Sequence, residues 1–254
     1  MTCRALRGRL PFPAFRGLFR AIVLGLAAVA ALCVSASAGD GYEALRHAMV
    51  EHDLKARGIT KPEVLAAMDQ VPRHLFVPDS LRAQAYADQP LVIGRDRSIY
   101  QPYVVALMTQ LLDLKHGDKV LEVGTGSGYH AAVLSRIARQ VYSIEIEDMV
   151  ARQASKRLAV LGYNNVEVHL GDGYQGWSER APFDAILLSA APPSKIPKPL
   201  LDQLRVGGKM VLPIGGGYFQ DLLVVTKTAD HLEKHTVIPV RLSPMRGKAQ
   251  DGTH

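Results

Sequence analysis

Three glycines at alternate positions, Gly124, Gly126 and Gly128, follow an apolar segment and could bring the backbone close to a ligand. Glycine permits a sharp turn and a close approach where any Cβ would interfere. Glu122 lies two residues before the turn, and its carboxylate suits a ligand's ammonium or hydroxyl groups better than a phosphate. We therefore expect a cofactor site here, made by Glu122, Gly124, Thr125, Gly126, Ser127 and Gly128.

Further polar residues follow later apolar segments, each where a strand is expected to end. They are Glu145, the pair Asp172 and Gly173, and Ser189. In open parallel sheets, ligands bind beyond the carboxyl ends of the strands, so these residues should gather beside the glycine turn. An acid in the position of Glu145 can accept both ribose hydroxyls, and Asp172 can accept from an adenine amino group.

Two features separate the possible cofactors. A dinucleotide fingerprint requires a glycine at position 129, where this chain has Tyr129, and the carboxylate of Glu122 would repel a pyrophosphate. S-adenosylmethionine carries an ammonium and a sulfonium but no phosphate. The residues therefore favour S-adenosylmethionine over a nicotinamide cofactor. The nine histidines show no metal-ligand spacing, so no metal site is expected.

Strands and helices alternate around these residues. Strands are predicted over 119–123, 141–146, 166–170, 183–189 and 209–214, and helices over 129–139, 149–161 and 199–204. Near-continuous apolar strands in such an alternation indicate a parallel sheet covered on both faces. We expect an α/β, Rossmann-like fold of the S-adenosylmethionine-dependent methyltransferase type, with a mostly parallel, doubly wound sheet.

Additions are expected at both ends of this core. Helices are predicted over 42–57, 60–70 and 104–112, the second with Pro62 in its first turn and a capping box from Thr60 to Glu63. Residues 85–101 should form a loop with short extended pieces, and 221–226 with 235–241 a hairpin at the sheet edge. We assign 39–115 to a helical and substrate-loop segment and 116–254 to the methyltransferase core, within one compact domain, 39–254.

The first 38 residues have the layout of a secretory signal peptide. Five arginines and no acidic residue accompany the 14-residue apolar run 21–34, and Ala36-Ser-Ala38 forms a small-x-small cleavage site. The run is short for a membrane span, which needs about 20 apolar residues. We expect cleavage after Ala38 and a periplasmic or secreted protein. An unprocessed chain that is cytoplasmic or anchored by its N-terminus is the alternative.

The leader also accounts for most of the chain's net charge of +6. It holds 5 of the 30 basic residues and none of the 24 acidic ones, so the remainder carries a net charge of only +1. No basic block remains to follow phosphates, and we expect no nucleic-acid partner. Cys3 and Cys33 both lie in the leader, which excludes disulfides and thiolate chemistry from the mature chain. We expect a monomer without stable membrane association.

Several segments resemble the protein-L-isoaspartate O-methyltransferase family, over roughly residues 43–250. The most specific are Val-Pro-Arg-His-Leu-Phe-Val-Pro at 71–78, Ala-Tyr-Ala-Asp-Gln-Pro-Leu-Val-Ile-Gly at 85–94 and Gln-Pro-Tyr-Val-Val-Ala-Leu-Met-Thr at 101–109. Leu-Glu-Val-Gly-Thr-Gly-Ser-Gly-Tyr at 121–129, Gly-Asp-Gly at 171–173, Ala-Pro-Phe-Asp-Ala-Ile at 181–186 and Pro-Met-Arg-Gly-Lys-Ala-Gln at 244–250 add to the likeness.

The resemblance implies transfer of a methyl group from S-adenosylmethionine to the α-carboxylate of isoaspartyl residues in damaged proteins or peptides. The ester then closes to a succinimide, which hydrolyses partly to normal aspartyl. A carboxylate is already ionised at neutral pH, so positioning is the main requirement.

The chain departs from the family at the loop before Gln101. The family has Thr-Ile-Ser there, with the serine assigned to the active site, whereas this chain has Ser98-Ile99-Tyr100. A phenol can also donate a hydrogen bond to a carboxylate. We therefore expect Tyr100 and Ser98 to be catalytic and Ile99 and Gln101 to bind substrate. Arg246 is a second departure, because the family has a small hydroxyl residue there.

Tyr100 leaves other functions open. One alternative is methylation of another carboxylate or a small acceptor. A second is a peptide-binding module of the same fold without turnover, although such a module would not need Glu122, Glu145 and Asp172 together at strand ends.

Overall fold

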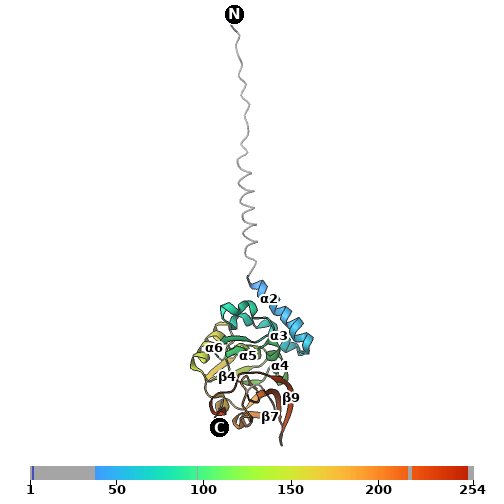
Figure 1. Ribbon diagram of the computed structural model, residues 1–254, viewed down its shortest axis with the longest axis vertical. Coiled ribbons are helices and arrows are strands. Elements are labelled where there is room, and N and C mark those ends of the chain that lie inside the picture. The colour runs from blue at the N-terminus through green and yellow to red at the C-terminus, as the bar shows by residue number, and fades with distance from the viewer. Residues whose placement is uncertain (1, 3–37, 96, 217–218, 251–254) are drawn as a thin grey trace. The chain divides into compact units, whose positions relative to one another are not determined.

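The computed structural model describes residues 2, 38–95, 97–216 and 219–250 of the chain (Figure 1). Two units are distinguished, Met1–Gly41 and Tyr42–His254. The signal peptide predicted for residues 1–38 lies outside the described residues except at Thr2 and Ala38, and the domain boundaries stay predictions. Within the described part, no helix is both long enough and apolar enough to cross a membrane.

A seven-stranded sheet forms the centre of the second unit. Its strands are β3 (Lys119–Val123), β4 (Gln140–Glu145), β5 (Val166–Leu170), β6 (Phe183–Leu188), β7 (Leu204–Ile214), β8 (Gln220–Lys227) and β9 (Leu232–Val240). Their order across the sheet is β5-β4-β3-β6-β7-β8-β9. The first five run parallel, and β8 and β9 add an antiparallel hairpin at one edge. The predicted sheet and edge hairpin are confirmed.

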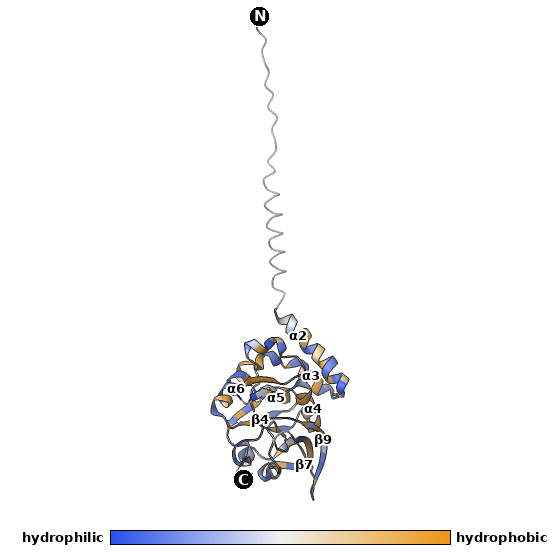
Figure 2. Ribbon diagram, viewed as in Figure 1, coloured by the Kyte–Doolittle hydropathy of each residue, from blue (hydrophilic) through white to orange (hydrophobic). Residues whose placement is uncertain are grey.

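Apolar cores lie on both faces of this sheet. Figure 2 shows hydrophobic colouring along its strands. Successive residues of β3 alternate between two cores, with Val120 in one and Leu121 in the other. Helices α3 (Pro62–Gln70), α4 (Pro102–Leu112) and α5 (Tyr129–Ser135) pack on the Val120 side. On the Leu121 side lie α7 (Lys198–Gln203) and part of the C-terminal segment, while α6 (Asp148–Val160) contacts β4 and β5.

Two helices differ most in length from the prediction. A single helix was expected over 42–57. The structure has instead α2 (Ala38–Ala48), a π-helix at Met49–Leu54 and a 3₁₀ turn at Lys55–Arg57. Helix α5 ends at Ser135 rather than at residue 139. The Asn165 side chain donates to the carbonyl oxygens of Ser135 (2.9 Å) and Ala138 (3.2 Å), which supplies these carbonyls with a partner outside the helix.

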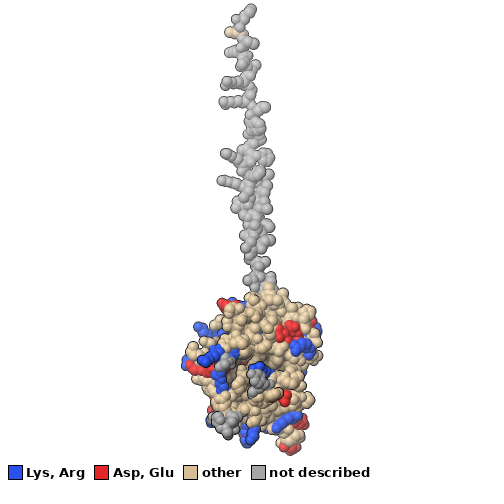
Figure 3. All heavy atoms as spheres, viewed as in Figure 1, with Lys and Arg blue, Asp and Glu red and all other residues tan. Residues whose placement is uncertain are grey.

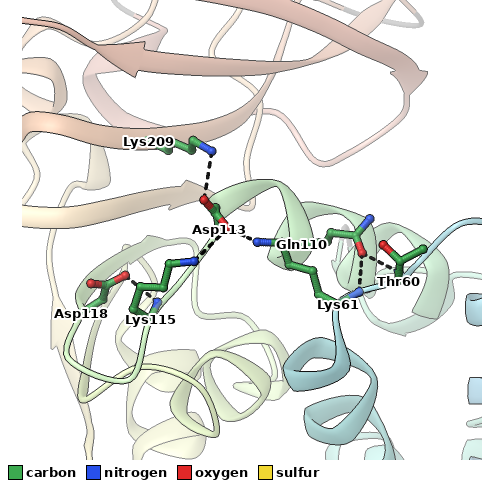
Figure 4. A network of polar contacts seen from close by, with 7 residues as sticks. All are labelled: Thr60, Lys61, Gln110, Asp113, Lys115, Asp118 and Lys209. Atoms are coloured by element: carbon green, nitrogen blue, oxygen red, sulfur yellow. Dashed lines mark hydrogen bonds and ion pairs between the residues drawn. The ribbon is translucent and has the colours of Figure 1, made fainter.

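The predicted capping box at Thr60 is wrong, because α3 begins at Pro62 and no side chain of its own segment caps it. The side-chain oxygen of Gln110, on α4, accepts instead from the backbone N–H groups of Thr60 (2.7 Å) and Lys61 (3.1 Å). Asp113 follows in the left-handed conformation at φ 56°. Its carboxylate pairs with Lys61, with Lys115 (3.2 Å) and with Lys209 of β7 (3.4 Å), as Figure 4 shows.

The segment before α4 forms the short extended pieces that were predicted. A small hairpin joins β1 (Leu91–Gly94) to β2 (Arg97–Ile99), and 3₁₀ turns occupy Arg73–Phe76 and Asp79–Gln84. Basic and acidic side chains are interspersed on the face drawn in Figure 3, with no continuous track of one sign there.

Candidate active site

A cavity of about 390 Å³ opens where the carboxyl ends of β3, β4 and β6 meet. Its wall includes the glycine turn, the loop that contains Tyr100, the ends of β4 and β6, and a C-terminal stretch from Ser243 to Arg246. These segments are far apart in the sequence, and the fold brings them together. Of the residues predicted at strand ends, Glu145, Gly173 and Ser189 also line the cavity. We divide the pocket into a cofactor half, around the glycine turn, and an acceptor half, around the loop and the C-terminal stretch.

The glycine turn needs its glycines for conformation. Gly124, Gly126 and Gly128 have φ values of 97°, 53° and 86°, a region that other residues rarely adopt. A Cβ built on Gly126 would meet nothing within 4 Å, so it would project into the space that a ligand needs. A Cβ on Gly128 would approach Leu158 of α6 at 3.2 Å. The first glycine is tied to β4 by the bond from its N–H to the Ile144 carbonyl (2.8 Å).

Glu122 lies fully buried at the base of the cofactor half. One carboxylate oxygen, Oε2, accepts from the hydroxyl of Ser143 (2.5 Å), which lies 2.6 Å from the Thr125 hydroxyl. The other oxygen, Oε1, has no hydrogen-bond partner. Burial raises the pKa of Glu122 to about 8, with the neighbouring charge of Glu145 adding to the rise and the Ser143 bond opposing it. A bound ammonium would favour the ionised carboxylate.

Glu145, at the end of β4, accepts hydrogen bonds from the backbone of the glycine turn and of the residues that follow β4. Its Oε2 accepts from the N–H of Gly126 (2.9 Å), and its Oε1 accepts from the N–H groups of Ile146 (2.9 Å) and Glu147 (3.1 Å). The side chain lines the cavity, so the position predicted for a ribose acceptor is at the correct edge. It also organises the turn itself, which the sequence did not indicate.

Unpartnered polar atoms concentrate around this cavity. Within the described residues, five buried side-chain polar atoms have no hydrogen-bond partner, and three of them belong to residues that line it: Glu122 Oε1, His130 Nδ1 and Ser189 Oγ. Buried polar groups normally have partners, so this concentration indicates a polar ligand or bound water. With the open space over Gly126, the residues fit a nucleoside cofactor that carries hydroxyl and ammonium groups.

His130 lies in the first turn of α5, below the cavity. The Thr109 hydroxyl donates to the Val105 carbonyl (2.8 Å), so it accepts from His130 Nε2 (3.0 Å). This bond fixes the tautomer with hydrogen on Nε2. Burial lowers the pKa of His130 to about 3, and the imidazole is therefore neutral at physiological pH.

Asp172 and Gly173 are adjacent in the sequence but line different hollows. Gly173 lines the main cavity, and a Cβ there would lie 2.3 Å from a methyl of Val123. Asp172 instead accepts from the N–H groups of Tyr174 (2.9 Å) and Lys248 (2.9 Å), and it lines a second hollow beside Trp177. In this structure its carboxylate anchors the C-terminal segment, and the adenine contact predicted for it stays a prediction.

On the acceptor half, Ser98, Ile99 and Tyr100 all line the cavity. The Tyr100 hydroxyl donates to the Ser189 carbonyl (2.6 Å) and accepts from the N–H of Ser243 (3.2 Å). Its single proton is therefore engaged within the chain, unlike the substrate-facing donor that we predicted. Burial raises the pKa of Tyr100 above its ordinary value, so the phenol stays protonated.

Gln101 is not among the residues that line the cavity. Its side-chain amide donates to the carboxylate of Asp88 (2.6 Å), and the other oxygen of Asp88 accepts from the Tyr103 N–H (2.9 Å). Asp88 also pairs with Arg57. Gln101 thus helps to fix the start of α4, in contrast to the substrate contact predicted for it.

Several polar residues of the cavity wall were not assigned to the site from the sequence, among them Arg97, Glu147 and Ser243. Arg97 forms no ion pair within the described part of the chain, whereas Arg246 pairs with Glu147 across the cavity. The departure at Arg246 was a signal for the C-terminal segment, but only the fold brings it to the cavity. Around this site, no group of three or more His, Cys, Asp or Glu in the described residues could hold a metal ion.

The parallel sheet, the glycine turn and the acidic strand ends define an S-adenosylmethionine-dependent methyltransferase. The family model described as protein-L-isoaspartate(D-aspartate) O-methyltransferase matches residues 44–250. The chain belongs to this family.

Curated relatives support the assignment along most of the chain. A protein-L-isoaspartate O-methyltransferase of Picosynechococcus sp. is 54% identical over 204 residues, which cover 80% of this chain and 91% of that protein. A protein-L-isoaspartate O-methyltransferase 1 of Nitrosospira multiformis is 51% identical over 219 residues, covering 85% and 92%.

Solved structures agree with the fold. One named protein-L-isoaspartate O-methyltransferase superposes with a TM-score of 0.73 at 28% identity, covering 80% of this chain and 67% of the other. A second, described as putative and from Plasmodium falciparum, is in complex with S-adenosyl-L-homocysteine; its TM-score is 0.67 at 25% identity, covering 79% and 98%.

Proposed function

We propose that the chain transfers a methyl group from S-adenosylmethionine to the α-carboxylate of isoaspartyl residues in damaged proteins, as the first step of their repair. The observation that carries this proposal is the pocket itself. It joins a glycine turn, beside which unpartnered polar atoms lie, to the loop 97–100, which lies between two of the segments that resemble the family, 85–94 and 101–109. Membership of the family indicates which acceptor group the pocket takes.

The chemistry asks for positioning rather than for a base. An isoaspartyl α-carboxylate is ionised at neutral pH, so no proton has to be removed before it attacks. When bound, S-adenosylmethionine supplies an electrophilic methyl group on a positively charged sulfur. The residues of the pocket have to hold the carboxylate in line and keep water away, and such orientation can supply much of the acceleration.

The charges in the two halves of the pocket support this division of labour. Glu122 and Glu145, in the cofactor half, favour a ligand with an ammonium and ribose hydroxyls. Arg97, on the acceptor half, offers a cation to an incoming carboxylate. The hydroxyl of Ser98 lies in the same wall, and we assign it to the acceptor carboxylate.

The proposal is tested by incubating the full chain with methyl-labelled S-adenosylmethionine and two peptides that differ only in isoaspartate or aspartate. We expect base-labile label on the isoaspartyl peptide alone. Binding of the cofactor with no label on either peptide would contradict isoaspartyl methylation and indicate a different acceptor. Failure to bind S-adenosylhomocysteine at all would favour a peptide-binding module and contradict an enzymatic function.

We also propose that the protein is exported and that the mature chain is monomeric. The support for export is the basic start, the apolar run 21–34 and the Ala-Ser-Ala sequence at 36–38. Expression in a bacterial host followed by fractionation should give a periplasmic chain that begins at Gly39, with the mass of one copy by light scattering. A chain that keeps its first 38 residues in the cytoplasm would contradict export.

A further inference from the structure

Tyr100 connects three segments that are distant in the sequence. Its hydroxyl donates to the carbonyl of Ser189, 89 positions away at the end of β6, and accepts from the N–H of Ser243, 143 positions away. Both of these bonds are to backbone groups, the Ser243 side chain also interacts with the phenol, and both residues line the pocket. A serine hydroxyl at position 100 would lie several ångströms nearer the backbone and could not make both bonds from the same place.

The backbone of Tyr100 is held as firmly as its hydroxyl. The guanidinium of Arg73, which is fully buried, donates to the Tyr100 carbonyl (2.7 Å) and to the Ala85 carbonyl (2.8 Å). Arg73 also lies over the ring of Tyr129, 4.8 Å from its centroid. Hydrogen bonds from a charged donor are the stronger kind, so the loop enters the pocket wall in a fixed position.

The third partner is the C-terminal segment, residues 242–250. Ser243 accepts from the Ala191 N–H and Met245 donates to the Ala191 carbonyl, both at 2.8 Å. These bonds lay the segment beside the end of β6, where Ser243, Met245 and Arg246 complete the acceptor half. Tyr100 is the side chain that joins this segment to the loop on the other side of the pocket.

We propose that Tyr100 is a positioning residue, which joins the loop 97–100 to the C-terminal segment and so fixes the acceptor half of the pocket. It acts on the acceptor through the wall that it holds, and its proton is not donated to the substrate. This inference rests on the proposed function for its substrate, but its structural part concerns the chain alone.

Tyr100→Phe tests the inference because it removes only the hydroxyl. We expect the Ser243 amide to exchange its hydrogen at least tenfold faster, followed residue by residue by NMR. The KM for an isoaspartyl peptide should rise about tenfold, with a kcat close to that of the wild type and an unchanged Kd for S-adenosylhomocysteine. Tyr103→Phe, in the first turn of α4 and outside the pocket wall, serves as the matched control.

The outcomes separate the inference from the proposed function. Unchanged exchange at Ser243 would overturn the positioning role, as would a large loss of kcat with unchanged exchange, because that result belongs to a direct donor. Methylation of neither peptide by the wild type would refute the proposed function, and the exchange measurement would still decide whether Tyr100 holds the segment. Tyr100→Ser should accelerate exchange at Ser243 as well, since its hydroxyl cannot reach.

Discussion

Two clusters of charged residues lie at opposite ends of the parallel strands, and they differ in how completely their polar atoms are paired. The Asp113 cluster lies at the amino ends, where one carboxylate pairs with Lys61, Lys115 and Lys209 (Figure 4). The pocket lies at the carboxyl ends, where Glu122 and Ser189 each keep a buried polar atom without a partner.

The difference shows which charges stabilise the framework and which await a ligand. Asp113 and its lysines are partly exposed to solvent, and their ion pairs join α4 to β7 and to the segment before α3. In the pocket the buried carboxyl of Glu122 lacks a cation, and this costs free energy that a bound ammonium can return. Incomplete pairing, rather than charge density, therefore identifies the site.

Glu145→Ala should give the largest effect. The carboxylate holds three backbone N–H groups, including that of Gly126, and is the proposed ribose acceptor. We expect S-adenosylhomocysteine to bind about 100-fold more weakly, a loss of about 2.7 kcal/mol by calorimetric titration. A change of less than threefold would mean that the ligand does not use this strand end.

Glu122→Gln should alter stability in a pH-dependent way. Because the pKa of Glu122 is about 8 in the fold and 4.5 in its ordinary state, the neutral form is favoured on folding. The contribution of the neutral carboxyl to the free energy of unfolding is complete below about pH 4.5 and is lost as the pH rises through 8.

In the absence of ligand, Glu122→Gln should therefore become more stable relative to the wild type as the pH rises between these values. We expect a gain of about 2 kcal/mol, since each pKa unit corresponds to about 1.4 kcal/mol and relaxation absorbs part of the shift. Urea unfolding at pH 5 and pH 9 measures it. Parallel pH profiles for the two proteins would contradict a raised pKa.

Arg97→Gln should weaken the acceptor without affecting the cofactor. Arg97 lines the acceptor half and has no ion-pair partner in the described residues. We expect the KM for an isoaspartyl peptide to rise about fivefold at low salt, about 1 kcal/mol, and the difference to shrink as salt screens the charge. Arg95→Gln, in the same hairpin but outside the pocket wall, is the control. An equal effect of both variants would indicate that the positive charge of the hairpin attracts the peptide and that Arg97 has no specific role.

Asp113→Asn should give the smallest effect and mark the contrast with the pocket. Asparagine tolerates the left-handed conformation at φ 56°, so the change removes the charge and one acceptor oxygen without straining the backbone. Since the ion pairs are partly exposed, we expect a loss of less than about 1 kcal/mol in the free energy of unfolding. The Kd for S-adenosylhomocysteine should not change. A weaker affinity would mean that the two clusters are coupled.

The sequence placed most of the residues expected to bind the cofactor at one edge of the sheet, because its information there is local; their contact with the cofactor stays a prediction. Three glycines in five residues determine the turn, and apolar strands with acids at their ends determine which edge of the sheet holds Glu145. The capping box at Thr60 failed for the opposite reason. A side chain 50 positions away, that of Gln110, took over the N–H group of Thr60.

The acceptor half could not be predicted from residue types alone. The bonds of Tyr100 cross 89 and 143 positions, and Asp172 turns to the backbone of Lys248, 76 positions along the chain. Gln101 is likewise held by Asp88. Such side-chain to backbone bonds have no periodicity in the sequence, so the loop was recognised through resemblance and its geometry only through the fold.

We infer that the incompletely paired pocket is the cofactor site. A crystal structure of the chain with S-adenosylhomocysteine tests it most directly. The ligand should lie along the glycine turn, with its ammonium or a water that it holds supplying the missing partner of Glu122 Oε1. A ligand bound in the hollow beside Trp177, or a pocket that keeps its unpartnered atoms with the ligand in place, would contradict the claim.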